Sequence, residues 1–181
     1  MTISTSAPWE AGLANWSSEG MHGELVSPEH VLKLLLAESE EGATSVYWRL
    51  DGVVCANGLL APAALATVQM LLGQLPRWTV EAKPFCLELL GQIAAAEPRE
   101  REASLRDACY AELRQAAWYF FNGLQFDTAA NVPFHVDLVG LLCAYYADLR
   151  EKGRAYLTRT LHRDLPAEVL ELIRATAAEL G

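Results

Sequence analysis

Apolar residues recur at three- and four-residue spacing along most of the chain, in segments separated by short polar, glycine or proline breaks. This period is typical of amphipathic helices, in which residues three and four apart share a face. The pattern therefore predicts an all-α fold. The expected helices cover approximately residues 27–37, 43–54, 62–75, 83–95, 102–125, 132–152, 154–162 and 166–180.

The most apolar stretch contains no charged residue between Asp51 and Arg77. That length raises the question of a membrane span, which needs roughly 20 apolar residues. However, Asn57-Gly58 favours a tight turn, Pro62 suits the first turn of a new helix, and no basic cluster flanks the stretch. We therefore expect a turn followed by a buried helix, and no membrane association.

The helices group into consecutive pairs, with the first pair at 27–54 and the second at 60–96. Stacked antiparallel helix pairs with a period of about 40 residues indicate a short α-solenoid of the HEAT-like type. Residues 1–26 show little periodicity and are expected to be an irregular lead-in, with one or both of Trp9 and Trp16 packed on the first helix. Exposed tryptophans would instead indicate a contact surface. Residues 27–181 are expected to form a single domain.

Composition and charge restrict the fold and the kinds of partner that the chain can have. Alanine and leucine dominate, which favours helix. The formal charge of −9 argues against nucleic-acid binding, because phosphate affinity comes from lysine and arginine. Residues 1–60 hold eight acidic residues and two basic ones, so this third is suited to a basic partner, although acids also simply keep a protein in solution.

Motifs for catalysis are not apparent. The chain has no phosphate-binding loop and no nucleophile elbow. The cysteines are isolated and the histidines scattered, so we expect no metal site, no cofactor and no enzymatic activity. Reduced cysteines and the absence of a signal-like N-terminus favour the cytoplasm. The aromatic run 118–121 is expected in the core. The alternative is that this run lines a ligand pocket together with His135 or Asp137.

Three segments resemble a group of bacterial HEAT-like repeat proteins. They are the helix around Trp48 that leads to Asn57-Gly58, the helix start Ala61-Pro62-Ala63-Ala64, and the run 87–94, which reads LELLGQIA. The similarity covers about a third of the chain, and the loop 55–59 departs from the usual family sequence. The motifs are structural, so they bear on fold more than on function.

Several proteins of that group are thought to be immunity proteins of polymorphic toxin systems. The resemblance implies that this chain binds and neutralises a cognate toxin with a basic surface by occluding its active site. The candidate partner-binding residues are Glu38, Glu40, Glu41, Trp48 and Asp51. Two other hypotheses stay open, which are a non-inhibitory interaction scaffold and a small-molecule-binding helical domain.

Overall fold

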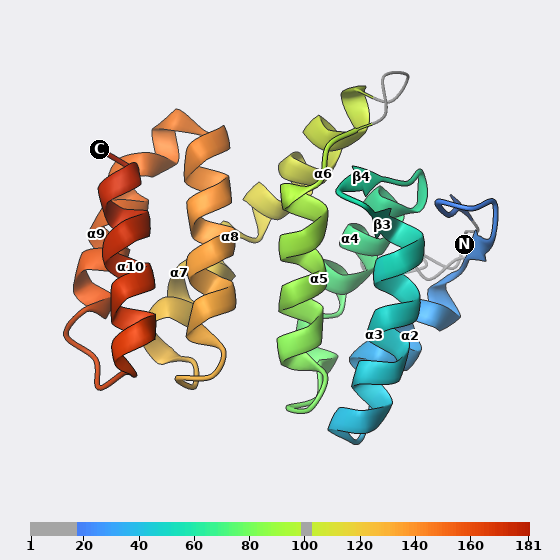
Figure 1. Ribbon diagram of the computed structural model, residues 1–181, viewed down its shortest axis with the longest axis horizontal. Coiled ribbons are helices and arrows are strands. Elements are labelled where there is room, and N and C mark those ends of the chain that lie inside the picture. The colour runs from blue at the N-terminus through green and yellow to red at the C-terminus, as the bar shows by residue number, and fades with distance from the viewer. Residues whose placement is uncertain (1–17, 99–102) are drawn as a thin grey trace, which may run out of the picture. The chain divides into compact units, whose positions relative to one another are not determined.

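The computed structural model describes residues 18–98 and 103–181, which contain nine α-helices and four strands of two residues each (Figure 1). The predicted all-α class is confirmed. Contacts divide the chain into two compact units, residues 1–112 and 113–181. Most of the expected lead-in, with Trp9 and Trp16, lies outside the described residues, whereas residues 18–26 form the antiparallel ladder of β1 (Ser18–Glu19) and β2 (Leu25–Val26).

The first unit is built on four helices, which are α2 (Pro28–Leu35), α3 (Glu40–Val54), α4 (Ala63–Gly73) and α5 (Lys83–Ala95). Helix α2 packs on α3, α4 and α5, and α3 packs on α4 and α5. The core takes the apolar stripe of each helix, including Leu34, Leu50, Val68 and Leu90. Ser27 caps α2 and Pro28 is its first residue, as the sequence predicts.

A tight hairpin joins the first helix pair to the second. Strand β3 (Cys55–Ala56) pairs with β4 (Leu59–Leu60), and the turn residues Asn57 and Gly58 have φ angles of 53° and 73°. Two positive φ angles define the turn type that matches the twist of a hairpin, and Asn-Gly is its preferred sequence. The turn predicted at this dipeptide is thus confirmed.

The second unit packs α7 (Ala117–Phe126), α8 (Val132–Tyr145), α9 (Arg150–Thr160) and α10 (Ala167–Glu179) around one core. Helix α8 contacts the other three helices. Val169 and Ile173 of α10 are buried, whereas Glu168, Glu171 and Arg174 are exposed. This is the orientation that the sequence predicts for the last helix.

Two of the long helices predicted from the sequence are divided in the structure. The long helix expected over 102–125 is two helices, α6 (Ala103–Gln115) and α7, which are separated at Ala116. The helix expected over 132–152 ends at Tyr145, and η2 (Ala147–Leu149) and α9 follow it. Neither break carries a glycine or proline. A constraint from either of those residue types therefore does not cause them.

A candidate partner-binding face on helix α3

Helix α3 begins earlier than the sequence predicts. The hydroxyl of Ser39 accepts a hydrogen bond from the Gly42 backbone N–H at 3.1 Å, which caps the helix. Glu40 and Glu41 are therefore in the first helical turn and not in a loop. Acidic residues are favourable there because the free amides carry partial positive charge. Glu38 precedes the cap and is exposed.

Four of the five predicted partner-binding residues belong to α3, where they form two pairs on neighbouring parts of its surface. Glu41 and Trp48 are seven residues apart and Glu40 and Asp51 eleven apart, and each spacing returns the helix to nearly the same direction. Trp48 is 64% exposed, although a packed tryptophan was the alternative. Its ring meets the Tyr47 ring edge-on, with centroids 5.1 Å apart.

The neighbouring helix α5 extends this acidic side through a residue that the sequence analysis did not select. Glu88 of α5 lies near the buried side chain of Tyr47. Burial, and after it the negative charges of Glu88 and Asp51, raise the pKa of Tyr47 well above its ordinary value. Two carboxylates from different helices therefore lie close to one hydroxyl group. We call Glu40, Glu41, Trp48, Asp51 and Glu88 the α3–α5 face.

None of the four carboxylates on the α3–α5 face forms an ion pair within residues 18–98 and 103–181. The face thus combines an exposed aromatic ring with acidic groups that no described lysine or arginine neutralises. Such a surface is suited to a basic protein, because Trp48 offers both apolar area and a π face to a cation.

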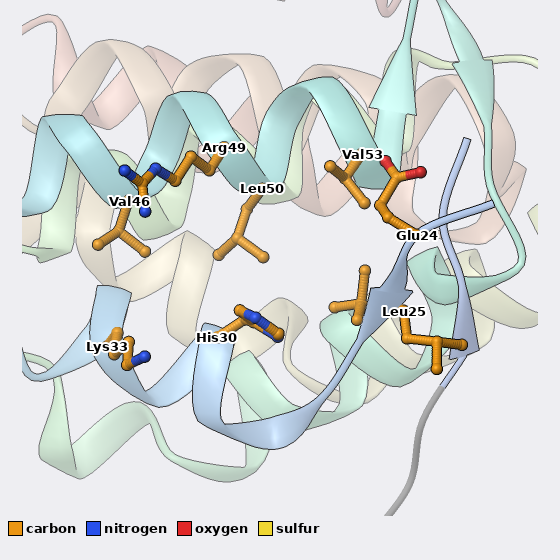
Figure 2. Close-up of a pocket in the computed structure, with 9 residues that line it drawn as sticks. Glu24, Leu25, His30, Lys33, Val46, Arg49, Leu50 and Val53 are labelled. Atoms are coloured by element: carbon orange, nitrogen blue, oxygen red, sulfur yellow. The ribbon is translucent and has the colours of Figure 1, made fainter. Parts of the chain in front are cut away.

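The opposite side of α3 lines a cavity of about 290 Å³ between α2, α3 and β2. Figure 2 shows Val46, Leu50 and Val53 of α3 on one side, with His30 and Lys33 of α2 facing them. Val46 lies two residues before Trp48 and Leu50 two residues after it. Residues two apart on a helix do not face the same side, so both side chains point away from Trp48. The cavity and the α3–α5 face are separate surfaces of one helix.

Of the two residues in the alternative hypothesis, His135 lies against the aromatic run, with its ring centroid 5.7 Å from that of Tyr119 and 6.4 Å from that of Phe120. His135 is fully buried, and its Nε2 lies 2.8 Å from Oδ2 of Asp127. Asp137 is exposed. Phe120 and Phe121 are core residues, as predicted, whereas Trp118 is 59% exposed, contrary to the expected burial of the whole run. The His135–Asp127 pair is packed between helices.

The four cysteines are reduced and buried. Burial raises the pKa of Cys143 to about 11 and that of Cys109 to about 12, and it raises those of Cys55 and Cys86 further. A thiol reacts as its thiolate. These side chains therefore act as small apolar core residues at neutral pH.

Comparison of the chain with known protein families, curated proteins and solved structures finds no match in any of the three. Within the part of the chain that the structure describes, no helix combines the length and apolar character that crossing a bilayer requires.

Proposed function

We propose that this chain is a bacterial cytoplasmic immunity protein that binds a cognate toxin through the α3–α5 face and blocks it. The observation that carries the proposal is the exposure of Trp48 among carboxylates that lack a cationic partner. Tryptophan is enriched among the residues that dominate binding energy at protein interfaces.

The packing of the first unit supports the HEAT-like part of the proposal. Helices α2 and α3 form one pair and α4 and α5 the next, and equivalent helices of the two pairs contact each other, α2 with α4 and α3 with α5. In Figure 1, α3 and α5 lie side by side. Stacked helix pairs bury a continuous core between repeats and present a row of equivalent helices to a partner.

The inhibition needs no catalytic residue on this chain. A toxin that cleaves nucleic acid or another anionic substrate carries a basic active-site cleft, and carboxylates at 40, 41, 51 and 88 complement that charge. The charges increase the association rate, whereas the buried ring of Trp48 in the complex slows dissociation. Occlusion follows from the bulk of the helical unit over the cleft.

The test is co-expression in a bacterium. The product of the adjacent upstream reading frame is produced with and without this chain, and growth is expected only when the chain is present. Trp48→Ala is expected to abolish rescue and to weaken the purified complex by about 30-fold or more, as for a residue that dominates binding energy. Glu41→Lys is expected to lower the association rate and its dependence on salt.

Trp118→Ala provides the matched control, because Trp118 is also an exposed tryptophan but belongs to the second unit. That variant is expected to rescue growth as the unchanged chain does. A neighbouring product that is harmless, or that kills regardless of this chain, would remove the immunity proposal. Rescue that is lost with Trp118→Ala and retained with Trp48→Ala would place the binding surface elsewhere.

A further inference from the structure

The cavity between α2, α3 and β2 collects the basic residues of an otherwise acidic segment. Residues 1–60 contain eight acidic residues and only two basic ones, Lys33 and Arg49, and both of these line the cavity. Neither forms an ion pair with another residue in the described ranges. Two cations that line one hollow and have no ion pair of their own point to an anionic group from outside the chain.

His30 adds a third donor to the same cavity. Its Nδ1 accepts a hydrogen bond from the Ser27 backbone N–H at 3.1 Å and lies 3.0 Å from the Ser27 hydroxyl. A backbone amide only donates, so Nδ1 carries the lone pair and the ring proton of the neutral imidazole is on Nε2. His30 lines the cavity between Lys33 and the β2 residues (Figure 2). The ring is therefore held in the form that donates a hydrogen bond from Nε2.

Apart from Glu24, the rest of the lining is apolar and defines the body of the ligand. Val26, Val46, Leu50 and Val53 contribute alkyl groups, and Val26 and Leu50 are almost fully buried. A volume of about 290 Å³ holds roughly ten non-hydrogen atoms when each takes about the 30 Å³ of a water molecule. This is below the range of drug-sized ligands and suits a short aliphatic chain.

Glu24 limits the charge of the ligand. Its carboxylate lies at the β2 end of the cavity in Figure 2, away from Lys33, and Oε2 accepts a hydrogen bond from the His22 backbone N–H at 2.9 Å. A second negative charge on the ligand would approach this carboxylate in a partly apolar space, where like charges repel strongly. A single anionic group at the Lys33–Arg49 end is therefore favoured over a ligand with acids at both ends.

We infer that this cavity binds a small aliphatic monocarboxylate, with the carboxylate held by Lys33, Arg49 and the Nε2–H of His30, and with the alkyl chain among the valine and leucine side chains. Arginine pairs with a carboxylate through two parallel hydrogen bonds, which fixes the orientation of the head group. The site uses the side of α3 opposite the α3–α5 face. Binding of the monocarboxylate is thus independent of the proposed toxin contact.

The experiment is an NMR titration of the full chain with hexanoate and, separately, with hexanamide, which has the same chain and no charge. Hexanoate is expected to shift the signals of His30, Val46 and Leu50 in a saturable manner, whereas hexanamide is expected to shift them without saturation over the same range. Arg49→Gln and Lys33→Gln are each expected to weaken hexanoate binding about tenfold or more, because each removes a hydrogen bond to a charged group.

Arg174→Gln is the matched control, since Arg174 is an exposed arginine on α10 of the second unit. Arg174→Gln and Trp48→Ala are both expected to bind hexanoate with the affinity of the unchanged chain. Because Lys33 and Arg49 are exposed, their variants are expected to unfold at the same urea concentration as the unchanged chain. Absence of saturable shifts with hexanoate, equal binding of hexanamide, or undiminished binding by both charge variants would overturn the inference.

Discussion

At the residue scale, α7 and α8 of the second unit approach each other closely at a glycine. A Cβ at Gly123 of α7 would overlap the ring of His135, which is held on α8 by its hydrogen bond to Asp127. The Asp127 carboxylate also accepts hydrogen bonds from the Thr128 backbone N–H and the Asn131 side chain. The ring therefore cannot move aside without breaking a buried polar network, which costs more than moving a flexible side-chain tip.

Gly123→Ala is therefore expected to destabilise the protein, although alanine favours helix over glycine by about 1 kcal/mol. Overpacking of a fixed side chain costs about 1–3 kcal/mol, which exceeds that gain. Gly91→Ala is the control, because Gly91 lies inside α5 with open space around it, and this change is expected to stabilise by up to about 1 kcal/mol. Urea unfolding followed by circular dichroism measures both. Equal stabilisation by the two changes would contradict the packing argument.

At the element scale, the hairpin after α3 also fixes the end of α5. The backbone N–H of Leu60 donates to the Glu97 carbonyl, and the Glu97 N–H donates to the Gly58 carbonyl, both at 2.8 Å. The turn and β4 thus hold Glu97, which lies two residues beyond the last residue of α5. The two-residue turn that follows α3 therefore also positions the chain that follows α5.

Gly58→Ala tests that element. The space around Gly58 is open, so the expected cost arises from its φ of 73° alone and is about 1–2 kcal/mol. Asn57→Gly is the matched change, and it is expected to have a much smaller effect because glycine accepts a positive φ. Denaturant midpoints of the two variants provide the comparison. A Gly58→Ala midpoint equal to that of the unchanged chain would show that the hairpin does not hold this conformation in solution.

Helix boundaries show what local sequence can and cannot predict. Pro28, Asn57-Gly58 and Lys83-Pro84 constrain the backbone by themselves, and the elements next to them begin where expected. The breaks at Ala116 and Tyr146 have no such residue. Apolar residues at helical spacing continue across both positions, so the local sequence does not mark where the helix ends.

At the scale of the whole molecule, the same distinction applies to the two surfaces of α3. The inward spacing of Tyr47, Leu50 and Val54 already directs Trp48 outward, so its exposure was accessible to sequence reasoning. Glu88 was not accessible, because it joins the acidic face only through the packing of α5 beside α3. The meeting of Lys33 and Arg49 at one cavity likewise depends on how α2 packs against α3.

The division into two compact units predicts that residues 113–181 fold alone. This fragment keeps α7–α10 and a core of its own that includes Phe120, Leu142 and Ile173. Domains of about 70 residues bury enough apolar surface for marginal independent stability. The isolated fragment is expected to show a helical circular dichroism spectrum and a cooperative thermal transition.

Phe120→Asp in the same fragment is the control, because it introduces a charge at a fully buried position and is expected to abolish the transition. The result decides between two descriptions of the chain. A cooperative fragment means that the first unit, with both surfaces of α3, can be studied and mutated without disturbing the second. A fragment that is unfolded until the rest of the chain is supplied would instead favour the single domain over residues 27–181 that the helix-pair pattern predicts.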